Sequence, residues 1–308
     1  MNFLKTAGLK IISLALITYL LTSCIKNNID STGTDSSSLA QLAEDELGVD
    51  AAIDDTWDDM NGFLDGGGFR SAASLPCSAT DSVVTTGDTI SHYLKFNGIN
   101  CTGTRFRSGQ VIMKHTNQQH WGEQGARIFV TLKNYKMTRL STTKSVTLNG
   151  HITYENTSGG RLSEIGNGNI TQVIQKGTGT ISVSFDNNVS QSWSMARQRA
   201  FNGPKGSRIV YTSGLGSQGG INYLVFWGSN RSGNPFNSQI NSILNYKEAC
   251  SGYPCSGTKM LQMSGALNNI VTYGYDDNNQ AVAGSACPTK IKLEIQSITY
   301  SGTIYIKL

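Results

Sequence analysis

Ten carboxylates after residue 66 are the first candidates for chemistry in this sequence. Two carboxyl groups about 5 to 10 Å apart suffice for glycoside hydrolysis, because one protonates the leaving group while the other attacks or activates water. Glu123 has the most suggestive neighbours, His120 and Trp121. A loop carboxylate beside a half-buried aromatic ring explains the same residues, and we favour that interpretation. The ten are Asp81, Asp88, Glu123, Glu155, Glu164, Asp186, Glu248, Asp276, Asp277 and Glu294.

Signatures of other enzyme classes are missing from the sequence. It contains no G-x-S-x-G segment for a serine hydrolase, no H-E-x-x-H for a zinc protease and no Walker-type phosphate loop. We therefore assign no catalytic residue. The sequence favours a non-enzymatic protein, with a carboxylate-dependent hydrolase as an alternative.

Metal ligation also has little support. There is no C-x-x-C and the chain holds four histidines, so zinc-type spacing is absent. Asp276-Asp277-Asn278-Asn279 offers hard oxygens for calcium, but it lacks the alternating spacing of a calcium loop and is typical of a turn. We expect neither a metal nor another cofactor.

Aromatic side chains are candidates for stacking on a sugar ring. Trp121 and Trp227 are the two that we single out as ligand-stacking residues, since an indole combines a flat apolar face with a polar N–H group. Packing in the core or within a hairpin is the alternative for both, and it is the commoner role of such residues.

The first 23 residues predict export. Lys5 and Lys10 precede an apolar run over 11–21, which is the order of a secretory signal. The run is too short for a transmembrane helix, which needs about 20 apolar residues. Leu21-Thr22-Ser23-Cys24 resembles the lipobox of bacterial lipoproteins, which implies cleavage after residue 23 and lipidation of Cys24. Residues 24–38 are rich in Ser, Thr and Asn and predict a flexible tether.

Five cysteines remain in the mature chain besides Cys24. An exported protein meets an oxidising compartment, where disulfides are the default. Cys77 and Cys101 are 24 residues apart and flank one strand-like segment, so they are the first candidate pair. Cys287 would then pair with Cys250 or Cys255 and leave one thiol free.

Residues 39–66 predict an acidic amphipathic helix. Its apolar residues recur at helical spacing, the acidic residues fill the opposite face, and Gly66-Gly67-Gly68 ends it. We expect the helix to cover an edge or end of the body that follows. The apolar stripe consists of Leu42, Val49, Ile53, Trp57, Met60 and Leu64.

Charge is divided unevenly along the chain. Residues 25–66 have a balance of −10, whereas residues 67–308 have a balance of +12. Either the acidic segment docks on or steers near the basic body, or both are solvated faces. We favour solvated faces because +12 spread over the whole body makes no dense patch. The same dispersion argues against nucleic acid as a partner.

Residues 67–308 predict a β-rich body. Short runs of alternating apolar and polar residues, without intervening helices, indicate a mainly-β fold of antiparallel, sandwich-like sheets, one large or two small. Asn149-Gly150 lies between two apolar runs and predicts a hairpin turn. The two final strands are expected to form a hairpin closed by Ser301-Gly302.

Three short segments carry a resemblance to a family. They are Leu75-Pro76-Cys77, Phe96-Asn97-Gly98-Ile99-Asn100-Cys101-Thr102-Gly103, and Arg105-Phe106-Arg107-Ser108-Gly109. Together with the lipobox, they resemble uncharacterised β-rich lipoproteins of Bacteroidota over most of residues 40–308. The resemblance implies a shared fold and lipid anchoring, but brings no known activity. It supports the Cys77–Cys101 pairing, whereas the extra cysteine among 250 and 255 departs from the family pattern.

The sequence as a whole favours a lipoprotein anchored in the bacterial cell envelope, with the outer membrane as the expected location. Binding, adhesion or envelope assembly is its expected role. A glycan-binding β-sandwich module is the first alternative and a hydrolase the second. The expected partners are the membrane, through the N-terminal lipid, and a protein or glycan whose identity the sequence does not give.

Overall fold

Every residue that the structure describes lies in one unit, Gly33–Leu308. The expected signal, the lipidated Cys24 and the tether up to residue 35 lie outside the described residues. The computed structural model describes residues 36–65, 75–167, 169–186, 190–250, 252–263, 269–284, 286–296 and 301–308.

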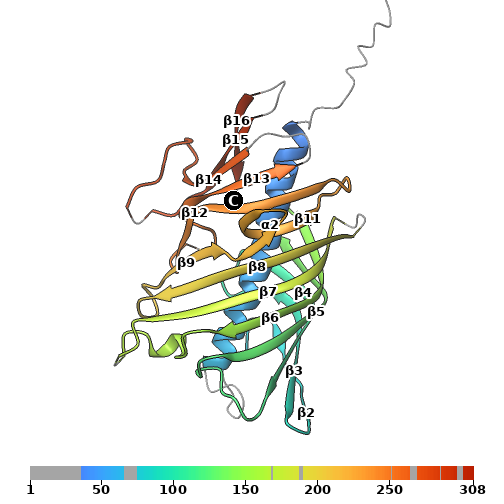
Figure 1. The fold of residues 1–308 in the computed structure, drawn as a ribbon, viewed down its shortest axis with the longest axis vertical. Helices are drawn as coiled ribbons and strands as arrows, with labels where there is room; N and C mark the ends of the chain where they lie inside the picture. The colour runs from blue at the N-terminus through green and yellow to red at the C-terminus, as the bar shows by residue number, and fades with distance from the viewer. Residues whose placement is uncertain are drawn as a thin grey trace, which may run out of the picture. The chain divides into compact units, whose positions relative to one another are not determined.

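One antiparallel sheet of sixteen strands forms the body (Figure 1). Most strands pair with their neighbours in sequence, in the order β1-β3-β4-β5-β6-β7-β8-β11-β12-β13-β14-β15-β16, while β2 pairs with β3, β10 with β11, and β9 with both β8 and β12. The mainly-β, antiparallel class is confirmed, as one large sheet. The strands are β1 (Ala79–Thr80), β2 (Val83–Thr86), β3 (Thr89–Ile99), β4 (Arg105–Thr116), β5 (Ala126–Arg139), β6 (Ser145–Asn156), β7 (Gln172–Phe185), β8 (Gln191–Asn202), β9 (Ile209–Gly214), β10 (Gly216–Gln218), β11 (Ile221–Ser229), β12 (Pro235–Lys247), β13 (Ser256–Met263), β14 (Asn269–Tyr275), β15 (Lys290–Gln296) and β16 (Ser301–Lys307).

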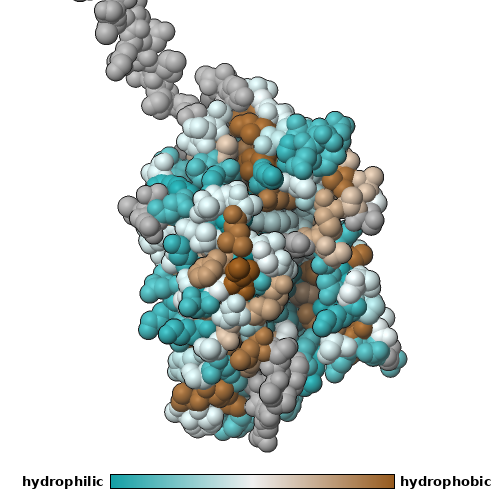
Figure 2. All heavy atoms as spheres, turned by 180° about the vertical axis from the view of Figure 1, so that it is seen from behind, coloured by the Kyte–Doolittle hydropathy of each residue, from teal (hydrophilic) through white to brown (hydrophobic). Residues whose placement is uncertain are grey.

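The strands bury one face and expose the other. In β5, Ile128 and Val130 are buried whereas Arg127 and Phe129 are exposed, as the two-residue repeat of a strand requires. The sheet therefore has an inner, apolar face and an outer face that meets water. On the side of the molecule opposite to Figure 1, apolar residues form separate patches among hydrophilic ones (Figure 2).

The helix α2 (Ser36–Asp65) packs on the inner face of the sheet. It contacts β6, β13, β15 and β16 and forms ion pairs with β4 and β8, so strands far apart in the sheet order meet the same helix and the sheet curls around it (Figure 1). The expectation that this helix covers an edge or end is wrong. It is buried on nearly all sides, including its acidic residues Asp45, Glu46, Asp50 and Asp54.

Trp57 fixes α2 against β6 and β7. Its indole N–H donates to Oε1 of Gln175 at 2.6 Å, and its ring centroid lies 4.5 Å from that of Tyr154. Gly177 leaves the room for this ring, since a Cβ atom there would lie 2.7 Å from the Trp57 six-membered ring.

Asn149-Gly150 does not form a turn, so the predicted hairpin is wrong. Both residues lie inside β6, where Gly150 pairs with Leu132 on one side and Ile181 on the other. A Cβ atom on Gly150 would lie 2.4 Å from the carbonyl oxygen of Thr180. The glycine therefore allows a close approach of two strands, a role that gives the same sequence signal as a turn.

The C-terminal hairpin forms as expected, because β15 pairs with β16. Its closing residues differ from the prediction. Ser301 and Gly302 already belong to β16, opposite Gln296 and Ile295, and the connection over 297–300 lies outside the described residues.

Two disulfides join the loops. Cys77–Cys101 confirms the first predicted pair, and Cys250–Cys287 resolves the choice for Cys287. Cys255 is a buried free thiol.

Gly177→Ala tests the packing of Trp57. We expect it to lower the free energy of unfolding by about 1–3 kcal/mol through overpacking, measured by urea denaturation. Gly62→Ala is the control, because Gly62 is an exposed helical residue with no atom near the new methyl group; it should gain up to about 1 kcal/mol from helix propensity. Equal effects of the two variants would refute this account of the packing.

Candidate functional site: a charged helix and its cleft

The acidic residues of α2 follow the helical repeat. Glu46, Asp50, Asp54 and Asp58 recur every four residues and so form one row. Four helical residues rise about 6 Å, and two strand residues span about 6.7 Å. Cations at alternate positions of a strand can therefore meet this row one by one.

The strands supply the matching cations. Lys259 of β13 lies 2.8 Å from Glu46 and also pairs with Asp50. Arg197 of β8 then bridges Asp50 at 3.0 Å and Asp54 at 2.7 Å.

The row continues toward the C-terminal end of α2. Arg199 lies 3.6 Å from Asp54 and 2.9 Å from Asp58. Arg197 and Arg199 are almost completely buried, whereas the Asp58 side chain is 57% exposed. The chain of contacts from Glu46 to Asp58 thus runs from the interior to the surface, and we call it the charge ladder.

A second row lies on the adjacent face of the helix. Arg105 of β4 donates to Asp55 at 2.5 Å, and Arg107 pairs with Asp59. The Arg107 guanidinium also lies 4.7 Å from the centroid of the Phe96 ring.

These contacts decide between the two interpretations of the charge distribution. The acidic segment docks on the basic body, and the favoured interpretation of two solvated faces is wrong. Dispersed arginines gave no dense surface patch because they point inward, at alternate positions of β4 and β8.

Burial perturbs the ionisation of both rows. Burial raises the pKa of Asp59 to about 7, although the Arg107 charge opposes this shift. Burial likewise raises the pKa of Glu46 against the effect of Lys259. Burial lowers the pKa of Lys259, but Asp50 and Glu46 more than reverse that and raise it well above its usual value.

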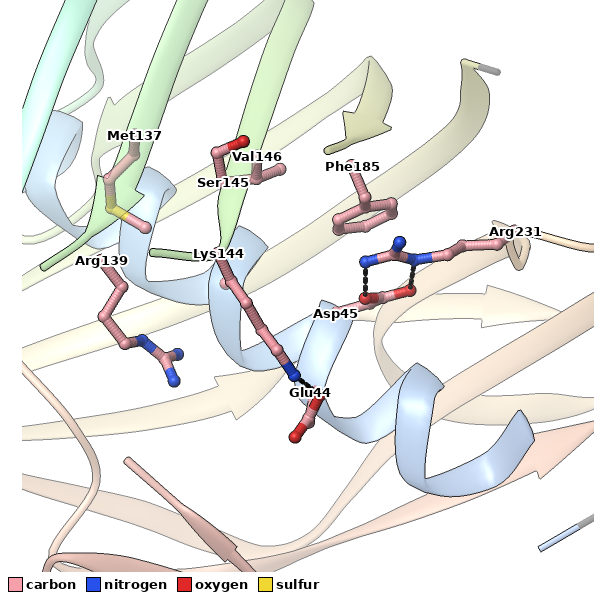
Figure 3. Close-up of a pocket in the computed structure, with 10 residues that line it drawn as sticks. Glu44, Asp45, Met137, Arg139, Lys144, Ser145, Val146, Phe185 and Arg231 are labelled. Atoms are coloured by element: carbon pink, nitrogen blue, oxygen red, sulfur yellow. Dashed lines mark hydrogen bonds and ion pairs between the residues drawn. The ribbon is translucent and has the colours of Figure 1, made fainter. Parts of the chain in front are cut away.

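The N-terminal half of α2 borders a small pocket (Figure 3). Arg231 donates to both carboxylate oxygens of Asp45 at 2.8 Å, and Lys144 reaches Glu44. The cavity of about 30 Å³ has room for about two water molecules. Its charged side chains, Glu44, Asp45, Lys144 and Arg231, pair across the pocket and link this end of the helix to the sheet.

A larger cleft opens beside the C-terminal half of α2. Its volume is about 490 Å³, within the range of about 300–1,000 Å³ that is usual for small-molecule sites. Its walls come from α2, β4, β8, β9, β12 and the short helix η1 (Leu162–Glu164). We call it the helix cleft; its charged lining residues are Asp55, Asp58, Asp65, Arg105, Arg199, Lys205, Arg208, Lys247 and Glu248.

Of the ten carboxylates that the sequence offers, Glu248 is the one that lines this cleft. Others have local partners elsewhere: Asp81 contacts His92 at 3.0 Å, and Asp276 accepts hydrogen bonds within its own turn. Glu123 is exposed in a turn, which agrees with the interpretation as a loop carboxylate.

The two tryptophans do not form an exposed platform. Trp121 is 3% exposed, and its N–H donates to Asn61 at 3.0 Å, so the expectation of an accessible ring is wrong for this residue. Trp227 is half-buried and lies over Gly216, where a Cβ atom would be 2.4 Å from the ring. The exposed aromatic residues include Tyr223 and Phe129 instead.

Sequence reasoning missed the residues that organise this site. The signal was present as two Arg-x-Arg pairs, at 105 and 107 and at 197 and 199, beside a helix with acids four residues apart. Neither the Arg-x-Arg pairs nor the acids at four-residue spacing are a specific signal alone. Their similar spacing, about 6 to 7 Å in each case, is the feature that could have linked them.

Comparisons with protein-family models, with curated proteins and with solved structures give no match to this chain. The resemblance to Bacteroidota lipoproteins therefore stays a prediction. In the described part of the chain, no helix is long and apolar enough to cross a membrane. No group of three or more potential metal-ligating side chains occurs among the described residues.

Lys259→Met tests the charge ladder. The variant leaves Glu46 buried without its cation, so we expect a loss of about 3–5 kcal/mol in the free energy of unfolding, measured by urea denaturation. Arg127→Met is the matched control because the Arg127–Glu155 pair is largely exposed; it should lose less than about 1 kcal/mol. Similar losses in both variants would contradict a buried ladder.

The pKa of Asp59 makes stability depend on pH. Between its ordinary value of 3.8 and about 7, the folded protein holds a proton that the unfolded chain has released. The contribution of this group is therefore greatest below about pH 4 and is lost as the pH rises toward 7. In unfolding measurements from pH 4 to 7, Asp59→Asn should flatten this decline, while the exposed Asp88→Asn should keep the wild-type profile. Parallel profiles for wild type and Asp59→Asn would refute the assignment.

Proposed function

We propose that this chain is an exported lipoprotein, anchored to the bacterial envelope through Cys24, and that its body is a non-enzymatic binding module with the helix cleft as its ligand site. The signal-like order of residues 1–23 and the lipobox-like segment before Cys24 support the anchor. Two or more acyl chains on one cysteine give stable attachment, because each buried methylene contributes about 0.8 kcal/mol.

The observation that carries the binding role is the helix cleft itself. It is large enough for a small molecule, and ion pairs with Asp55 and Asp58 fix two of the arginines in its walls, Arg105 and Arg199. A preorganised polar cleft of this kind binds without needing to order its own side chains.

The two alternatives have weaker support. A hydrolase needs two carboxylates free to exchange protons in one cleft, but Asp55 and Asp58 are each paired with an arginine. A glycan-stacking surface built on Trp121 and Trp227 would lack the Trp121 ring, because that ring is buried in the core. A protein or glycan partner on the outer face is compatible with a ligand in the cleft.

Cys24→Ala tests the anchor. The full chain, expressed with its first 23 residues in a bacterium fed a labelled palmitate analogue, should incorporate label and partition with the detergent phase. Cys24→Ala should lose both properties, whereas Cys255→Ala should keep them because that thiol is buried in the body. Label retained in Cys24→Ala would overturn the proposed anchor.

A further inference from the structure

The helix cleft contains five cationic and four anionic side chains. The anionic side chains are bound to groups of the protein more completely than the cationic ones. All four carboxylates have donors from the protein. Asp55 and Asp58 pair with Arg105 and Arg199, as described for the two rows.

The other two carboxylates accept hydrogen bonds from backbone N–H groups. Asp65 accepts the N–H of Ser163 at 3.0 Å and so fixes η1 against the end of α2. Glu248 accepts the N–H groups of Gly206 and Arg208 at 2.7 and 3.2 Å and fixes the turn before β9. Each lining carboxylate thus has at least one donor from the protein, while Oδ1 of Asp65 has no partner among the described residues and the Asp58 side chain is 57% exposed.

Three cations on the same walls, Lys205, Arg208 and Lys247, form no ion pair within 4 Å among the described residues. The Arg208 charge still lies close enough to Asp65 to oppose the burial that raises the pKa of that carboxyl. Lys247 donates to the carbonyl of Gly284, and Arg208 donates through Nη2 to the carbonyl of Leu162 at 2.9 Å. Lys205 is exposed in the turn at the cleft mouth.

Arg199 shapes the wall of the cleft without offering a free donor to it. Its side chain is 3% exposed and is paired with Asp54 and Asp58. The Nε atoms of Arg199 and Arg208 have almost no accessible surface, so a ligand in the cleft does not reach them. Arg208 as a whole is half-buried and lines the cleft.

We propose that the helix cleft binds a small polar anion that carries a carboxylate or phosphate group. This inference rests on the proposed function, since it names the ligand class of the same site. Arg208 is the anchoring residue because its planar guanidinium matches the geometry of both oxyanions. Lys205 adds attraction at the mouth, where solvent and salt screen it. Ser163 and Thr102, also on the walls, offer hydroxyl groups to the rest of the ligand.

The test compares three sugars that differ in one group: glucose, glucuronate and glucose 6-phosphate. Isothermal titration of the full chain in detergent should show binding of glucuronate, of glucose 6-phosphate or of both, and none of glucose. The affinity should fall as sodium chloride is raised. The two acids distinguish a carboxylate site from a phosphate site.

Variants locate the site. Arg208→Met should weaken binding of the acid about tenfold or more, the range for a lost hydrogen bond to a charged group. Lys205→Met removes an exposed side chain and should weaken it by a smaller factor at low salt. Lys133→Met, on the exposed outer face of β5, should bind as wild type. Thermal unfolding checks that each variant is folded.

Equal binding of glucose and the acids, unchanged affinity in both Arg208→Met and Lys205→Met, or no binding of either acid at millimolar concentration would each overturn the proposal. The palmitate experiment on Cys24 is independent of these results. A lipidated chain that binds neither acid would therefore refute the ligand class while leaving the anchor in place.

Discussion

A carboxylate in the interior stays charged only when cations or hydrogen-bond donors surround it, and this constraint shapes the core of the body. Removing an isolated charge from water costs several kcal/mol even after relaxation, yet α2 carries Glu46, Asp50 and Asp54 into the interior. The arginines and Lys259 of the surrounding strands must therefore lie at the same positions along the helix axis as their acidic partners. The charge ladder thereby ties the register of β8 and β13 to the rotation of the helix.

Apolar packing supplies the stability that the ladder does not. Leu42, Val49, Ile53 and Trp57 are buried with the inner faces of the strands in one core, and this burial is the dominant favourable contribution. Buried ion pairs are often no more stabilising than apolar residues of the same volume, because desolvation offsets their attraction. A shift of α2 by one residue would rotate its acids away from their partners and bring apolar side chains against guanidinium groups, so a single arrangement is selected.

The local features were readable from the sequence, whereas the enclosure of the helix was not. The alternation of the short strands and the apolar stripe of the helix depend on neighbouring residues, and both are confirmed. The acidic face of α2 was taken for a solvated face because one sequence displays charges without their partners. Gly150 misled for a related reason: a close approach between strands and a turn both select glycine, and sequence alone does not distinguish them. The cleft depends on side chains from six elements, and no local pattern contains it.

The central helix is also the first element in the described part of the chain, and this order has a kinetic consequence. Glu46 meets Lys259 across 213 residues, and contacts of such long range form slowly because the intervening chain must close first. Until β13 exists, the helix has no complete set of partners. Before those partners form, the high density of acidic groups favours hydration of the helix and repulsion between copies. The acidic residues that pair with cations in the finished core thus also give the unpartnered helix a negative charge, which disfavours association between like-charged copies.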